Sequence, residues 1–130
     1  MIILALRTDK PEAELYLYDG HKKLSEVKWQ AHRQLAETIH IQIQKMLDGS
    51  SILMNDVRGM ACFRGPGSFT GLRIGLSVAN ALAYSLEIPV VTRRTDNWLK
   101  LAIDDLLAGK NEQIAIPFYG RPANTTQPRK

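Results

Sequence analysis

Apolar and polar positions at the start of the chain follow the pattern of three successive β-strands. Residues 2–6 form a continuous apolar run, which is typical of a strand covered on both faces. In residues 15–18 leucine alternates with tyrosine, as in a strand with one buried face. The Asp19-Gly20 pair is a strong hairpin signal, and residues 24–29 continue as a third strand. The chain therefore begins with a predicted three-stranded antiparallel unit.

The next segment repeats its large apolar residues at helical spacing. Leu35, Ile39 and Ile43 lie at helical intervals, and the pattern ends at Gly49, a residue type favoured just after helices. Residues 39–44 also alternate apolar and polar positions, as a strand would. We predict a helix because the longer window fits a period of about 3.6 residues and closes at a helix-stop signal.

The rest of the chain alternates predicted strands and helices. Pro89 ends a long apolar helix, and Thr95 or Asp96 is a suitable N-cap for the last helix, which Gly109 terminates. Such alternation predicts an α/β layer architecture. The predicted elements are a strand over 57–63, a helix over 71–86, a strand at 90–91, a helix over 95–108 and a short strand over 114–116.

Composition is that of an ordinary globular domain. The 130 residues are 45% hydrophobic and 23% charged with a mean hydropathy of -0.18, which excludes collagen-like, disordered and membrane-spanning classes. The opening apolar run stops at Arg7, too early for a signal peptide, so we expect a cytoplasmic protein. Cys62 is the single cysteine; it excludes an internal disulfide and is expected to fill the core.

The net charge of +4 is concentrated at the C-terminal end. Residues 117–130 contain Arg121, Arg129 and Lys130 and no acidic residue, which leaves a nearly neutral domain over 1–116. This stretch has prolines and no periodicity, so we predict an extended basic tail. Such a tail can contact RNA phosphates, but we interpret it first as a solubilising, weakly ordered end.

Glycine is concentrated in residues 65–75, directly after the strand predicted at 57–63. The lysine and hydroxyl of a Walker loop are replaced by Leu72-Arg73, and Ser68 lacks the glycine that a nucleophile elbow places two residues earlier. The segment can form an anion-binding corner at a helix start, or a turn that packs the helix closely. We predict the structural turn, formed by Gly65, Pro66, Gly67, Ser68, Phe69, Thr70 and Gly71.

This glycine-rich segment closely resembles the signature of the TsaB (YeaZ) family, bacterial accessory proteins of tRNA threonylcarbamoyladenosine synthesis. Further similar stretches lie at 2–6, 29–33, 79–83 and 117–122, so the resemblance covers most of the chain. It implies one lobe of the actin and Hsp70-like ATPase fold, which is ribonuclease H-like, with a mixed sheet and flanking helices. It also implies a non-catalytic scaffold subunit for N6-threonylcarbamoyladenosine formation at adenosine 37 of ANN-decoding tRNAs.

The resemblance further implies partners and the surface that binds them. In that family the first and second helices contact the catalytic TsaD-type subunit, and the same surface forms a homodimer. A TsaE-type ATPase is a further expected partner, and tRNA is expected to be contacted indirectly or through the tail. The interface residues expected on this basis are His32, Leu35, Ile39, Ile43, Arg73, Gly75, Leu76, Ala79, Leu82 and Ala83.

The second predicted helix itself carries a stripe of small residues. Gly71, Gly75, Ala79 and Ala83 recur every four positions beside a stripe of leucines, and small residues permit close approach of another helix. A helix that is apolar around so much of its circumference needs cover on two sides. The sheet can cover one side of the helix while a partner protein covers the other. The alternative is that the small-residue stripe and the leucine stripe both face the sheet.

Two departures from the family pattern bear on catalysis. Residues 95–116 stand where the family has a second lobe, so we expect a reduced, single-lobe form without a cleft between lobes. Arg7 lies near the end of the first strand, where catalytic relatives place a metal-binding carboxylate, and an arginine cannot ligate Mg²⁺. Asp9 is expected to cap the turn that follows.

We expect no metal site, no cofactor and no autonomous catalysis. His21, His32 and His40 are scattered along the chain, and the adjacent Asp104 and Asp105 are expected to solvate the outside of a helix. Two other functions remain as alternatives. One is an ATP-binding or peptidase-like enzyme of the same superfamily, and the other is a tRNA-binding module that uses the basic tail.

Overall fold

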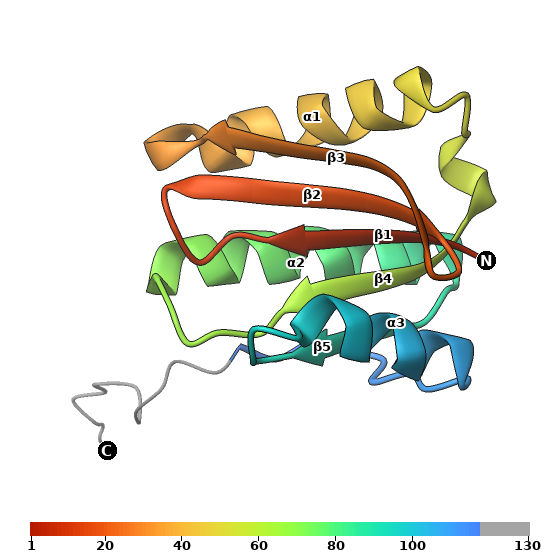
Figure 1. Ribbon diagram of the computed structural model, residues 1–130. Coiled ribbons are helices and arrows are strands. Elements are labelled where there is room, and N and C mark those ends of the chain that lie inside the picture. The colour runs from red at the N-terminus through yellow and green to blue at the C-terminus, as the bar shows by residue number, and fades with distance from the viewer. Residues whose placement is uncertain (118–130) are drawn as a thin grey trace, which may run out of the picture.

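Five strands form one mixed sheet in the computed structural model, which describes residues 1–117. The first three strands are antiparallel neighbours, β4 lies parallel to β1, and β5 lies parallel to β4 at the edge (Figure 1). The spatial order is β3-β2-β1-β4-β5. The strands are β1 (Ile2–Arg7), β2 (Glu12–Asp19), β3 (Lys22–Gln30), β4 (Val57–Phe63) and β5 (Val90–Arg93).

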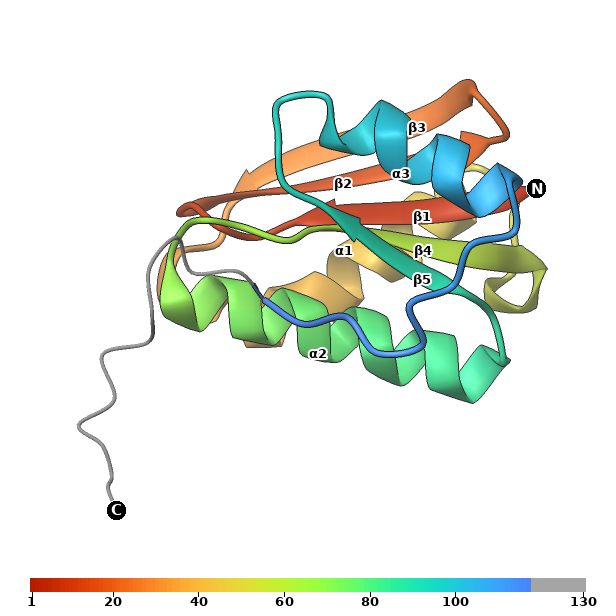
Figure 2. The same ribbon diagram turned by 90° about the horizontal axis from the view of Figure 1, so that it is seen from below.

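Helices cover the two faces of the sheet unequally. Helices α1 (Leu35–Gly49) and α2 (Phe69–Leu86) lie on one face, and α3 (Trp98–Leu107) lies on the other (Figure 2). Short 3-10 helices at His32–Gln34 and Met54–Asp56 precede α1 and β4. Two helices therefore cover one face of the sheet and a single helix covers the other.

The core has two parts, one on each side of β1. Leu4 and Leu6 contribute to the cluster under α1 and α2, whereas Ile3 and Ala5 contribute to the cluster under α3. Successive side chains of a strand point to opposite faces, so a strand covered on both sides must be apolar at every position. The continuous apolar run at 2–6 is thus explained by a strand that is covered on both faces, as predicted.

The predicted order of strands and helices is confirmed, with two differences. The N-cap of α3 is Asn97, rather than the predicted Thr95 or Asp96, and the helix begins at Trp98. Residues 114–116 do not form a strand. Both backbone groups of Ala115 are bonded to the side chain of Asn80 instead of to a neighbouring strand.

Two further expectations concern single side chains. Cys62 is fully buried in the core, as expected. Asp105 does not solvate the helix exterior: it is 8% exposed, and its carboxylate pairs with Arg93 at 2.7 Å and with Lys110 at 3.3 Å. Asp104, its neighbour, does face outward and contacts His21 at 2.7 Å.

The tail predicted over 117–130 lies, apart from Pro117, outside the described residues. The boundary predicted at 116 and 117 therefore stays a prediction. Within residues 1–117, none of the helices has the length and apolar character needed to cross a membrane.

Candidate functional site

The glycine-rich segment forms a tight corner between β4 and α2. Ser68 is the N-cap of α2, and its hydroxyl accepts a hydrogen bond from the Gly71 amide at 3.4 Å. The backbone amide of Ser68 donates to the carbonyl of Asp9 at 2.9 Å. A Cβ at position 67 would collide with Asp9, and one at position 71 would collide with the carbonyl of Thr8. Glycine is needed at both positions because the turn after β1 lies directly against the corner.

The end of β1 is occupied by an ion pair within the chain. Arg7 donates from Nε to Oδ1 of Asp9 at 2.8 Å and from a terminal nitrogen to Oδ2 at 3.2 Å. The guanidinium also stacks on the Phe63 ring, 3.9 Å from its centroid. Asp9 is 7% exposed, so this carboxylate is buried and paired rather than capping the turn as expected. Among residues 1–117, no group of three or more His, Cys, Asp or Glu side chains could hold a metal ion.

Most of the side chains expected at the partner interface point into the core. Only His32 and Arg73 of the ten are exposed, and Leu82 is half-buried. The small-residue stripe of α2 faces its own sheet, because a Cβ at position 75 would collide with Thr8 and come within 3.1 Å of Leu6. The buried members of the expected set are Leu35, Ile39, Ile43, Gly75, Leu76, Ala79 and Ala83.

The surface that α1 and α2 do present to solvent contains a groove between them. Ala36 and His40 of α1 line one side, and Phe69, Arg73 and Ser77 of α2 line the other, around a volume of about 400 Å³. Phe69 is 49% exposed, and the Arg73 guanidinium lies 5.3 Å from the centroid of its ring. The helix pair was predicted correctly, but Ala36 and Ser77 were not singled out, because a hydrophobic period marks the buried side of a helix, and His40 was considered only in the search for a metal site.

A second hollow, of about 720 Å³, adjoins the groove at the amino-terminal ends of α1 and α2. Its lining includes Lys10, His32 and Arg33 together with the hydroxyls of Ser68 and Thr70. The backbone of His32 has a φ of 47°, a left-handed value that is uncommon outside glycine. The charged side chains of this lining, Lys10 and Arg33, are both basic, and Lys10 lies 3.8 Å from the Glu14 carboxylate, whereas the groove beside it is mixed apolar and polar.

Comparison with known proteins identifies the family. A family model described as TsaD, tRNA N6-adenosine threonylcarbamoyltransferase, matches residues 28–95, more than half of the chain. The chain belongs to that family. TsaD of Clostridioides difficile is 44% identical over 74 residues, which are 56% of this chain and 22% of that protein.

Within the TsaD family, the similarity to TsaB extends over more of the chain. The tRNA threonylcarbamoyladenosine biosynthesis protein TsaB of Haemophilus influenzae is 35% identical over 89% of this chain and 49% of its own length. TsaB of Escherichia coli is 39% identical over 68% of this chain and 43% of its own length. The chain thus spans about half the length of these curated relatives, and the resemblance to TsaB is confirmed.

A solved structure supports the same assignment. YeaZ from Pseudomonas aeruginosa superposes with a TM-score of 0.67 and 28% identity, covering 72% of this chain and 43% of that chain. The mixed sheet with two helices on one face and one on the other is therefore a lobe of the actin-like, ribonuclease H-like ATPase fold, as expected from the sequence.

Proposed function

We propose that this chain is a non-catalytic scaffold subunit that pairs with a TsaD-type catalytic subunit in N6-threonylcarbamoyladenosine modification, at adenosine 37 of ANN-decoding tRNAs. The observation that carries the proposal is the similarity to TsaB over 89% of the chain, which includes the whole of α1 and α2. The TsaD family model matches residues 28–95, which include α1 and α2, so a TsaD-type partner can offer an equivalent pair of helices to this chain.

The groove between α1 and α2 is the surface we assign to this pairing. Phe69 and Arg73 stand together beside it, and exposed aromatic and arginine side chains are the residue types that most often anchor protein interfaces. Ala36 and Ser77 are small, so a side chain of the partner can enter between the helices. The contact then uses the outer faces of both helices. The residues that were expected at the interface but are buried hold those faces in place.

The ion pair at the end of β1 supports a non-catalytic role. A carboxylate that holds Mg²⁺ must offer free oxygen atoms, and both oxygens of Asp9 accept hydrogen bonds from Arg7. Breaking such a pair leaves a buried charge without compensation, which costs about 3–5 kcal/mol. In this proposal the chemistry is carried out by the TsaD-type partner.

Four finer features belong to the same proposal. The isolated chain forms a homodimer through the same groove, so the TsaD-type subunit and the second copy compete. A TsaE-type ATPase is a further partner of the pair. tRNA is contacted only indirectly or through the basic tail, which lies outside the described residues apart from Pro117. The complex works in the cytoplasm.

Co-purification of the full chain with a tagged TsaD-type subunit tests the proposal. Ser77→Arg places a long charged side chain in the groove and should abolish co-purification, because a buried unpaired charge costs several kcal/mol. Ser85→Arg, at another exposed serine of α2 away from the groove, is the matched control and should bind as the wild type does. Both variants should keep the wild-type melting temperature, since both serines face water.

Three results would contradict the proposal. The first is absence of binding by the wild-type chain, and the second is a Ser77→Arg variant that still binds. The third is saturable binding of ATP with Mg²⁺ by the isolated chain in calorimetry, which would favour an enzyme of the same superfamily. Binding of tRNA with a steep salt dependence would favour the RNA-binding alternative.

A further inference from the structure

The outer edge of β5 offers backbone hydrogen-bonding groups to the side away from β4. The backbone groups of Val90 and Thr92 point outward, away from β4. The carbonyls of the residues before and after them, Pro89 and Arg93, point toward β4. They accept hydrogen bonds from the amides of Met60 and Arg64. An edge of this kind is a template on which another strand can pair. In this molecule it is covered by residues 110–117, which return from the end of α3.

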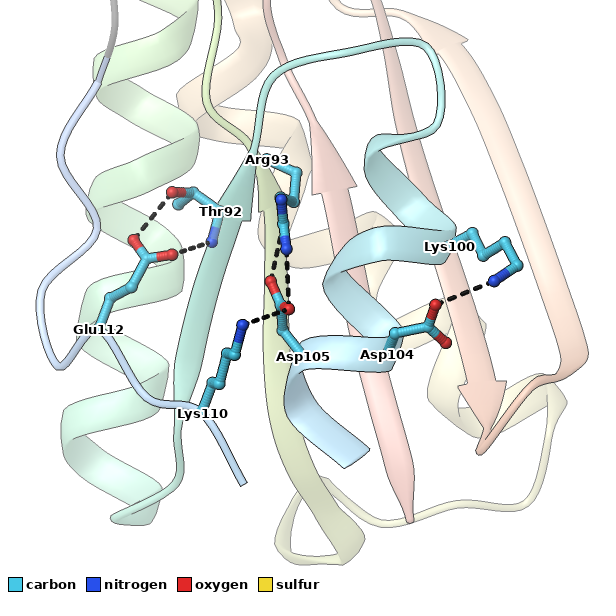
Figure 3. Close-up of polar contacts among 7 residues, drawn as sticks. All are labelled: Thr92, Arg93, Lys100, Asp104, Asp105, Lys110 and Glu112. Carbon is cyan, nitrogen blue, oxygen red and sulfur yellow. Dashed lines mark hydrogen bonds and ion pairs between the residues drawn. The ribbon is translucent and has the colours of Figure 1, made fainter. Parts of the chain in front are cut away.

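Side chains close the edge in place of a sixth strand. The Glu112 carboxylate accepts from the Thr92 amide at 2.7 Å and from the Thr92 hydroxyl at 2.8 Å (Figure 3). The Asn111 side-chain oxygen accepts from the Val90 amide at 3.1 Å. One backbone bond, from the Glu112 amide to the Val90 carbonyl at 2.9 Å, completes the set. Each outward group of Val90 and the outward amide of Thr92 is thus satisfied by residues 111 and 112.

The closing segment is held mainly by polar contacts. At its start Lys110 reaches Asp105 of α3, which also holds Arg93 (Figure 3). Near its end, Ala115 exchanges two hydrogen bonds with Asn80 of α2, at 2.7 and 3.1 Å. Residues 110–114 are all exposed, and Ala115 is the buried anchor among them. Little apolar area is lost from water here, so the segment can open at low cost compared with the core.

We propose that the β5 edge is a strand-addition site for a second copy of this chain, and that residues 110–117 keep it closed. The outward residues Val90 and Thr92 are two positions apart. A twofold axis through Val91 therefore places Val90 of each copy opposite Thr92 of the other. In an antiparallel pair, residues so opposed exchange both of their backbone hydrogen bonds. The edge is complementary to itself, which is the condition for a closed symmetric dimer.

The β5 edge is separate from the groove between α1 and α2, although the end of the closing segment, at Ala115 and Pro117, lies in a hollow that Arg73 and Ser77 also line. The groove lies on the outer side of the helix layer, whereas β5 is the end strand of the sheet. A dimer through the groove would be present in the unaltered chain, but a dimer through β5 should form only after the segment opens. The two proposals can therefore fail independently.

Hydrogen exchange at the Thr92 amide, followed as a function of protein concentration, tests this inference. In Glu112→Ala the closing carboxylate is lost, so at low concentration this amide should exchange about tenfold faster than in the wild type. At high concentration it should become protected again, while light scattering shows a mass increase that the wild type lacks. Asn80→Ala, which releases the other end, should act in the same direction.

Ile114→Ala is the matched control, because this side chain is 66% exposed and lies in the same segment. It should exchange as the wild type does at every concentration. Wild-type protection of the Thr92 amide in both Glu112→Ala and Asn80→Ala would overturn the closing role. Two results would overturn the second copy as the occupant. One is a Thr92 amide that stays in fast exchange at high protein concentration, and the other is a mass increase that leaves this amide unprotected.

Discussion

The hydroxyl of Thr8 donates a hydrogen bond to the backbone carbonyl of Gly71 at 2.8 Å, joining the end of β1 to the first turn of α2. Thr8 is 3% exposed, and its side chain fills the space directly over Gly75. The short distance between helix and strand therefore depends on the absence of a Cβ at these two glycines. It fixes the position of α2, and with it the wall of the groove that carries Phe69 and Arg73.

Gly75→Ala should destabilise the protein. Alanine favours a helix over glycine by about 1 kcal/mol, but the added Cβ collides with the Thr8 hydroxyl, and overpacking of a core costs about 1–3 kcal/mol. We expect overpacking to exceed the helix gain, with a net loss of up to about 2 kcal/mol, or up to roughly 8 °C in melting temperature. Thermal unfolding followed by circular dichroism measures this.

Two companion variants identify the cause. Thr8→Ala removes the colliding side chain, so Gly75→Ala should cost less in that background than in the wild type. Gly49→Ala adds a Cβ where nothing lies within 4 Å, and should be neutral or stabilising. A rise in melting temperature for Gly75→Ala would show that the contact with Thr8 relaxes freely.

Hydrophobic spacing predicted the helix pair but not which side faces outward. Both stripes of α2 were apolar, and the sequence could not show that Gly75 and Ala79 approach β1 while Arg73 and Ser77 line a groove. The approach is determined by Thr8, which lies more than sixty positions earlier in the chain than Gly71. Likewise, residues 114–116 resemble a strand, but the side chains of Asn80 and Glu112 take the place of the ladder, and local patterns do not contain such contacts.

Ala79→Arg should unfold the protein rather than test the interface. Ala79 is fully buried between α2 and the sheet, so its replacement places an unpaired charge in the core, at a cost of several kcal/mol. Ala81→Arg is the control, because Ala81 is exposed on the same helix. Circular dichroism should show a cooperative melt for Ala81→Arg and a lost or strongly lowered melt for Ala79→Arg. A stable Ala79→Arg variant would mean that α2 can turn this residue outward.

Asp105→Asn should flatten the dependence of stability on acid pH. Hydrogen bonds from Arg93 hold the pKa of Asp105 below its usual value, with Lys110 adding to the effect. A carboxyl whose folded pKa is lowered stabilises the protein above its unfolded pKa, near 4, and this stability is lost as pH falls through the folded pKa. The variant should therefore lose about 1–2 kcal/mol at pH 7, and this loss should shrink as the pH falls below the unfolded pKa and through the folded pKa of Asp105.

Melting temperatures at about pH 7, 5 and 3 test this, with Asp104→Asn as the control. The pKa of Asp104 is also lowered, by hydrogen bonds from His21 and Lys100, but this carboxyl is exposed to solvent. Water screens such pairs, so Asp104→Asn should change the pH dependence less. Equal changes for the two variants would show that the burial of Asp105 contributes nothing.

Arg7→Met should destabilise the protein through the charge that it leaves behind. Without the guanidinium, the Asp9 carboxylate stays buried and loses both of its ion-pair hydrogen bonds, which costs about 3–5 kcal/mol. Asp9→Asn in the Arg7→Met background removes that charge, so the double variant should recover much of the loss in a thermal melt. Additive losses would mean that the two side chains contribute separately.

The same ion pair predicts that the wild type, titrated with ATP and Mg²⁺ in a calorimeter, gives no saturable heat at micromolar concentrations. Arg7 already occupies both carboxylate oxygens that the metal would need, so Mg²⁺ would have to displace the guanidinium before it could bind there.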